Sequence, residues 1–90
     1  MTIQYKTRGV CSRQMNVKLE DGVIQDVEII GGCDGNLKGI SRLVVGMKAE
    51  DAIQRMEGIH CGPKQTSCPD QLSKALKIGL AEEAKRAQEN

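Results

Sequence analysis

Four cysteines are the residues of this 90-residue chain best suited to chemistry: Cys11, Cys33, Cys61 and Cys68. Thiolates are nucleophiles and soft metal ligands, and a reducing cytosol keeps them from forming a disulfide framework. Zinc takes four such ligands in a closed tetrahedral site, and iron–sulfur clusters use the same thiolates. We therefore predict that the four cysteines bind a metal, with zinc as first choice and an iron–sulfur cluster as second.

The spacing of the cysteines leaves two other interpretations open, since no Cys-x-x-Cys pair of the zinc-ribbon kind is present. Cysteines can simply fill a core, but core cysteines usually sit in apolar runs, and polar or turn residues flank three of these four. A redox relay, in which electrons pass to a reductase, would use Cys61 and Cys68 as reactive and resolving thiols. The relay is the alternative to the metal site.

Cys61 and Cys68 lie in residues 58–70, which also hold both prolines and the only histidine. This composition predicts a ligand-bearing loop that opens into a helix. Cys33 and Cys68 each directly precede a predicted helix, where backbone amides and the helix dipole favour a thiolate. His60 is more often a surface residue than a ligand and stays outside the predicted set.

Alternating apolar residues predict a short strand around Ile3 and Tyr5 and two further strands at residues 14–20 and 23–30. Asp-Gly at 21–22 predicts a hairpin turn between these two. The expected buried faces are Met15, Val17 and Leu19 on one strand and Val23, Val27 and Ile29 on the other. Because the turn lies midway between Cys11 and Cys33, the hairpin can bring both to the same end of the sheet.

Helical spacing predicts three helices after the strands: one carrying Leu37, Ile40, Leu43 and Val44, one at residues 49–56, and a long one at about 69–88. The long helix is expected to bury a stripe of Leu72, Ala75, Leu76, Gly79, Leu80 and Ala84. Strands followed by helices indicate an α+β fold: a small antiparallel three-stranded sheet with helices packed on one face. We expect one domain over residues 1–90.

Composition excludes several function classes. The net charge is +1, with 13 basic and 12 acidic residues, and Tyr5 is the only aromatic residue, so we expect no nucleic-acid partner. No apolar stretch is long enough to span a membrane, and the N-terminus lacks a signal-peptide core, so we expect a cytoplasmic protein. A core without Phe or Trp is thin, which leaves a homodimer open.

Thr66-Ser67-Cys68-Pro69-Asp70 resembles the motif that names the TSCPD domain family, and residues 32–36 and 60–62 match its pattern too. The resemblance covers nearly the whole chain. Members occur alone and as the C-terminal domain of adenosylcobalamin-dependent ribonucleotide reductases, and their cysteines are thought to bind metal. The resemblance implies an accessory module for a ribonucleotide reductase rather than an enzyme, because the chain has no catalytic constellation or nucleotide cradle.

The order of cysteines, hairpin and helices is also similar to that of the U-type iron–sulfur scaffold proteins. This likeness would match Cys11, Cys33 and Cys68 to the three scaffold cysteines. Arg13 and Ser67 replace the scaffold's acidic residue and histidine, and Cys61 is an added thiol. These departures favour a tight all-thiolate site over cluster assembly.

Overall fold

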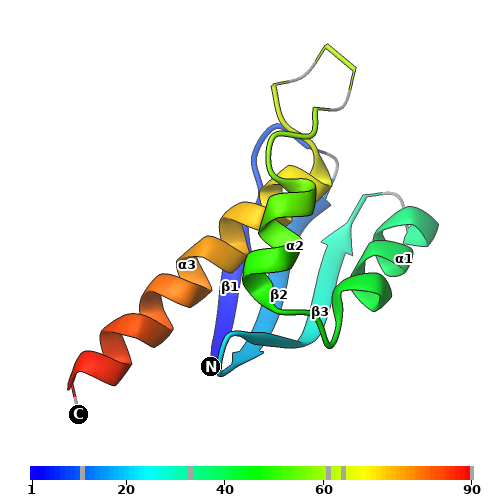
Figure 1. Ribbon diagram of the computed structural model, residues 1–90. Helices are drawn as coiled ribbons and strands as arrows, with labels where there is room; N and C mark the ends of the chain where they lie inside the picture. Colours follow the sequence, from blue (N-terminus) through cyan, green and yellow to red (C-terminus); the bar gives the residue numbers. More distant parts are fainter. Residues whose placement is uncertain (11, 33, 61, 64, 90) are drawn as a thin grey trace.

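The computed structural model describes residues 1–10, 12–32, 34–60, 62–63 and 65–89. In this part of the chain the elements are β1 (Thr2–Lys6), β2 (Ser12–Glu20), β3 (Val23–Gly31), α1 (Asp34–Val44), α2 (Ala49–Met56) and α3 (Cys68–Glu89). The strands form one antiparallel sheet in the order β1-β2-β3, and the helices lie on one side of it (Figure 1). The predicted α+β fold is confirmed. No helix of the described ranges is long and apolar enough to cross a membrane.

The hairpin between β2 and β3 turns at Asp21 and Gly22, whose φ angles are 51° and 76°. Positive φ at both central positions is the requirement of the tight turn that Asp-Gly predicts. One predicted face is wrong, however. The register shifts beside Leu19, which pairs with Ile24, so Ile24 is fully buried while Val23 pairs with Glu20 on the other face. A bulge of this kind inverts the alternation, and a strict period of two therefore misplaces Val23.

The core lies between the sheet and the helices and is aliphatic. α3 crosses β1 and β2, α2 packs on α3, and α1 lies along β3. Met15, Val17 and Leu19 of β2 are fully buried, as predicted. From the helices, the core takes Val44, Ala49, Ala52, Ile53, Met56, Leu72, Ala75 and Leu76. The lone aromatic residue, Tyr5, is only partly buried against this cluster.

The long helix α3 buries its first half and extends past the sheet (Figure 1). Leu72, Ala75 and Leu76 are buried, but Ala84 is exposed, so the predicted stripe is too long at its C-terminal end. The helix leaves the edge of the small sheet before Ala84, and no described element covers that position. At Gly79 the helix passes so close to β2 that a Cβ atom there would clash with the Leu19 side chain.

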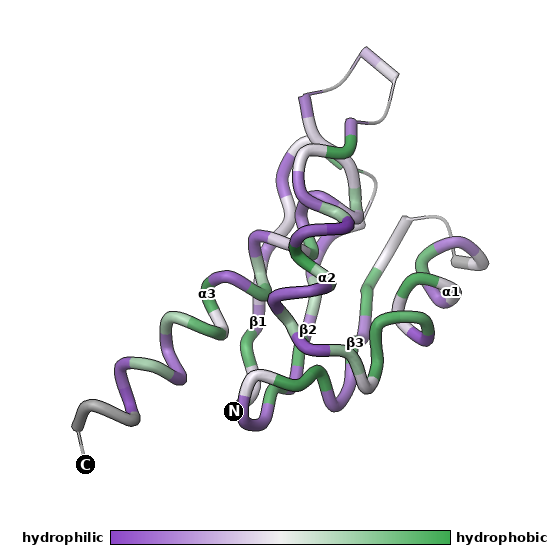
Figure 2. The backbone as a smooth tube through the Cα atoms, in the orientation of Figure 1, coloured by the Kyte–Doolittle hydropathy of each residue, from purple (hydrophilic) through white to green (hydrophobic). Residues whose placement is uncertain are grey.

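α1 packs less completely than its sequence suggests. Leu37 and Val44 are buried, yet Leu43 is 77% exposed, contrary to the predicted apolar face. Figure 2 shows hydrophobic residues along much of this helix. The connection to α2 is fixed by Ile24, whose backbone N–H donates to Met47 and whose carbonyl accepts from Gly46, at 2.9 and 2.8 Å. α1 is thus held at its C-terminal end against the start of β3.

Candidate metal centre

Cys68 is the first residue of α3 and is partly buried. Its sulfur lies 3.4 Å from the hydroxyl oxygen of Ser12, the first residue of β2. Ser12 is itself buried and pairs with Gly31, the last residue of β3. The beginning of β2, the end of β3 and the beginning of α3 therefore meet at one end of the sheet.

The segment before β2 also lies against the first turn of α3. The Arg8 amide donates to the Gln71 side-chain oxygen at 3.0 Å. Gly9 has a φ of +71°, and a Cβ atom there would lie 3.3 Å from the Thr66 methyl carbon. Glycine suits this position for two reasons: the backbone is left-handed, and Thr66 leaves little room for a side chain. The residues that precede Cys11 in sequence are thereby held beside the start of α3.

Asp70 holds both ends of the loop between α2 and α3. Its Oδ1 accepts a hydrogen bond from the Gly58 amide at 2.8 Å, and its Oδ2 accepts one from the Thr66 hydroxyl at 2.5 Å. The Ser67 hydroxyl donates to the Ile59 carbonyl at 2.6 Å. Two of these bonds join residues 58–59 to residues 67–70, and the third joins Thr66 to Asp70, so the loop that carries Cys61 in sequence begins and ends at the first turn of α3.

Ser67 caps α3 in the way that N-terminal serines usually do. The Asp70 amide donates to the Ser67 hydroxyl at 3.2 Å, and the Gln71 amide donates to the Ser67 carbonyl at 2.8 Å. Pro69, the second residue of the helix, has no amide hydrogen to satisfy, and an acid at position 70 suits the helix dipole. Each residue around Cys68 in the Thr-Ser-Cys-Pro-Asp motif thus helps to begin the helix there.

The pKa of the Asp70 carboxyl is lowered, chiefly by the hydrogen bond from the Thr66 hydroxyl. The Gly58 amide and the positive charges of Lys74 and His60 act in the same direction, while burial opposes them. The Lys74 ammonium lies 3.7 Å from Oδ2. The carboxylate form is the one that accepts these hydrogen bonds, so the loop contacts depend on an ionised Asp70.

The predicted ligands are only partly within the described residues. Cys68 is described, whereas Cys11, Cys33 and Cys61 lie outside the described residues. Within the described ranges, no three His, Cys, Asp or Glu side chains gather closely enough to hold a metal ion. The side chain of His60 is exposed.

Sequence reasoning missed the polar residues that fix this end of the molecule. Ser12, Asp70 and Gln71 are at most 5% exposed, although polar side chains usually stay at the surface. Thr66 joins them, accepting a hydrogen bond from the Gln71 amide group at 3.0 Å. The sequence offered one signal for these contacts. In the motif around Cys68, the helix-capping Ser67 is followed three positions later by the acidic Asp70.

Together these features define a small α+β domain in which the start of β2 and residues 58–59 contact the start of its last helix. The chain belongs to the TSCPD domain family, which matches residues 1–80. Neither the curated proteins nor the solved structures include a significant match.

Proposed function

We propose that Cys11, Cys33, Cys61 and Cys68 bind one metal ion or cluster, with zinc first and an iron–sulfur cluster second. The observation that carries the proposal is the contact of Ser12 with Cys68 at 3.4 Å, made by a residue that pairs with Gly31. In the sequence, Cys11 directly precedes Ser12, and Cys33 follows Gly31 by two residues. These short tethers link both cysteines to the end of the sheet that contacts Cys68.

The fourth ligand, Cys61, is supported by the loop contacts. Gly58 and Ile59 are bonded to Asp70 and Ser67 respectively, at either side of Cys68. Only one residue, His60, separates Ile59 from Cys61 in the sequence. A donor set of four thiolates is the chemistry of a structural zinc site or of an iron–sulfur cluster. Such a site would cross-link three segments of a small domain whose core is thin.

The partner that we propose is a ribonucleotide reductase, because of the resemblance to the C-terminal domains of the adenosylcobalamin-dependent enzymes. The chain would then act as a metal-binding accessory module. Size-exclusion chromatography of the two purified proteins tests this part separately. Co-elution that depends on the loaded metal supports it, and independent elution at micromolar concentration overturns it while leaving the metal site untouched.

Metal analysis of protein purified without oxygen tests the site itself. We expect about one equivalent of zinc, or one cluster with visible absorption, in a four-thiolate site. Each single Cys→Ser variant should lose most of the metal. His60→Ala is the matched control in the same loop and should keep it. Less than about half an equivalent of any metal in the unmodified protein counts against the site.

The thiol relay is a second candidate, favoured by the partial exposure of Cys68 at the start of α3. It predicts that mild oxidation of the metal-free protein joins Cys61 to Cys68, which mass spectrometry of the digested protein detects. In the relay, Cys61 and Cys68 would give two electrons and two protons to a disulfide of the reductase as they themselves become a disulfide, and a cytosolic dithiol reductant would then restore the two thiols. No disulfide under these conditions rules the relay out.

A further inference from the structure

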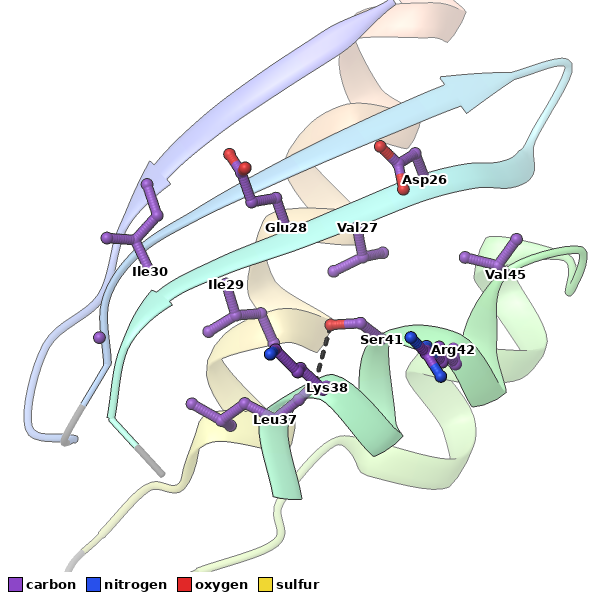
Figure 3. A pocket seen from close by; sticks show the side chains of 11 residues that line it. Asp26, Val27, Glu28, Ile29, Ile30, Leu37, Lys38, Ser41, Arg42 and Val45 are labelled. Atoms are coloured by element: carbon purple, nitrogen blue, oxygen red, sulfur yellow. Dashed lines mark hydrogen bonds between the residues drawn. The ribbon is translucent and has the colours of Figure 1, made fainter. Parts of the chain in front are cut away.

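A groove of about 510 Å³ lies between β3 and α1 (Figure 3). One end of its lining is Gly31, the last residue of β3. Its strand wall is an unbroken run of β3, residues 26–31. Its helix wall consists of Leu37, Lys38, Ser41, Arg42 and the following Val45. The groove therefore follows the edge of the sheet along most of one strand.

The edge of β3 in this groove has backbone groups that pair with no strand of the described residues. β3 is the last strand of the sheet. Leu19 of β2 exchanges its backbone hydrogen bonds with the first residue of the chain, on the β1 side. The backbone N–H and C=O groups of successive residues in an antiparallel strand face opposite neighbours in turn. The backbone groups of Lys18 therefore face its β3 partner, Asp26. Val27 and Ile29 must then direct their N–H and C=O groups to the outer edge.

Such an edge can accept an extended segment as a further strand. Proteins usually protect an exposed edge with proline, a very short strand or a covering element. β3 has nine residues and no proline, and its register shift lies near its start. Among the described residues, no backbone hydrogen bond from outside the sheet reaches Val27 or Ile29. Val27 is only 7% exposed and Ile29 is half-buried, so an added strand would reach the backbone of Ile29 more readily than that of Val27. The helix wall adds side chains beside this edge.

The charges around the groove indicate which side chains an added strand should carry. Asp26 and Glu28 are exposed and point away from α1, whereas Val27 and Ile29 point toward it (Figure 3). Glu28 accepts one hydrogen bond, from the side-chain amide of the neighbouring strand's Asn16 at 2.8 Å. An added strand would place alternate side chains beside the two carboxylates, where opposite charge stabilises a cross-strand pair.

The other side chains of an added strand would meet an apolar surface. Ile29 is half-buried and Leu37 is 5% exposed on that side. The exposed Arg42 of α1 borders the surface and disfavours a basic side chain there. A second copy of β3 is a poor occupant, because it would bring Asp26 and Glu28 of both copies close to one another.

We propose that this groove binds an extended segment of a partner protein, in which basic and β-branched apolar residues alternate, as a fourth strand on β3. Backbone hydrogen bonds to Val27 and Ile29 would supply affinity. Asp26 and Glu28 would form ion pairs with the basic side chains, and the apolar side chains would pack on the surface that faces α1. This surface adjoins the proposed metal site at Gly31, two residues before Cys33, but includes none of the proposed ligands.

Hydrogen exchange with two synthetic peptides tests the proposal. The probe is Lys-Val-Arg-Val-Lys-Ile with blocked ends, and the control has the same residues in block order, Lys-Lys-Arg-Val-Val-Ile. The alternating peptide should slow exchange of the Val27 and Ile29 amides by at least about tenfold and the block peptide should not. Equal effects of the two peptides, or protection elsewhere in the protein, overturn the proposal.

Two modifications separate strand pairing from simple charge attraction. N-methylation of the peptide at the residues facing β3 should abolish protection, while N-methylation at the intervening residues should preserve it. The double substitution Asp26→Lys and Glu28→Lys should transfer binding to the peptide with glutamates in place of its basic residues. A dimer in sedimentation velocity, with Val27 and Ile29 already protected without peptide, would mean that a second copy occupies the edge and would overturn the proposal.

Discussion

The Ser12 hydroxyl lies 3.4 Å from the Cys68 sulfur, although 56 positions separate the two residues in the chain. Ser12 begins β2 and Cys68 begins α3. A polar contact to the sulfur of a proposed metal ligand belongs to the surroundings that orient ligands and tune a site. The pair therefore connects the fold of the sheet to the chemistry proposed for the start of the helix.

Replacing Ser12 by alanine should weaken metal binding without unfolding the protein. Loss of an outer-shell partner typically lowers metal affinity about 10-fold or more. Competition with a chromophoric zinc chelator measures the change. Ser41→Ala is the matched control, because that hydroxyl donates to the Leu37 carbonyl one turn earlier in α1. Equal affinities of the two variants would show that Ser12 has no influence on the site.

Replacing Ser67 by alanine should lower the free energy of unfolding by about 1 kcal/mol, the usual cost of a lost helix cap. The same change removes the bond to the Ile59 carbonyl. Urea denaturation measures the stability, and faster amide exchange at residues 58–60 would report the loosened loop. Ser73→Ala is the comparison within α3, since its hydroxyl donates to the Asp70 carbonyl within the same helix. If Ser73→Ala costs as much as Ser67→Ala, the capping argument is wrong.

The contribution of Asp70 to stability should disappear in acid. The pKa of its carboxyl is lowered in the folded protein, chiefly by the Thr66 hydroxyl. A carboxyl of this kind stabilises the fold above its unfolded pKa, and the stabilisation is lost as the pH falls through the folded value. Metal-free Asp70→Asn should therefore be less stable than the unmodified protein at pH 7, and the difference should shrink below about pH 4.

Paired urea titrations of the two metal-free proteins between pH 7 and pH 3 check this expectation. Metal-free protein is needed because acid also protonates cysteine thiolates and releases a bound metal. If the difference in unfolding free energy between the two proteins stays constant across this pH range, the negative charge of Asp70 does not stabilise the fold.

Two glycine substitutions should act in opposite directions. Gly79→Ala places a methyl group against Leu19 and should destabilise the protein by about 1–3 kcal/mol, the usual cost of overpacking. Gly39→Ala, on an exposed face of α1 with no atom within 4 Å of the new Cβ, should stabilise it by up to about 1 kcal/mol. Thermal denaturation measures both. A neutral Gly79→Ala would mean that α3 can move away from β2.

Local chemistry predicted the elements well. Asp-Gly placed the hairpin, and helix 49–56 has the predicted limits, because the acids of its first turn and the glycine after it are local signals. The errors concern relations between elements. A register shift buries Ile24, and Leu43 and Ala84 are exposed. These features depend on where one element stops covering another, and hydrophobic periodicity within one element does not predict that.

For the candidate site, too, the sequence predicted local features better than contacts between distant segments. The prediction that a helix begins directly after Cys68 is within one residue of the observed start of α3 at Cys68, because Pro69 and Asp70 are local start signals. That the start of β2 lies beside Cys68 depends on a contact between distant segments, and although Cys11 precedes Ser12, no local signal in the sequence predicts the contact of Ser12 with Cys68. The meeting of Cys11, Cys33 and Cys61 with Cys68 stays a prediction.

The most direct test of the central claim is the X-ray absorption spectrum of the anaerobically purified protein at the K-edge of its bound metal. A four-cysteine site predicts a first shell made only of sulfur, which for zinc means four atoms at about 2.3 Å. A first shell dominated by nitrogen or oxygen, or one that keeps four sulfur atoms in a Cys11→Ser variant, would contradict the claim that these four thiols share one site.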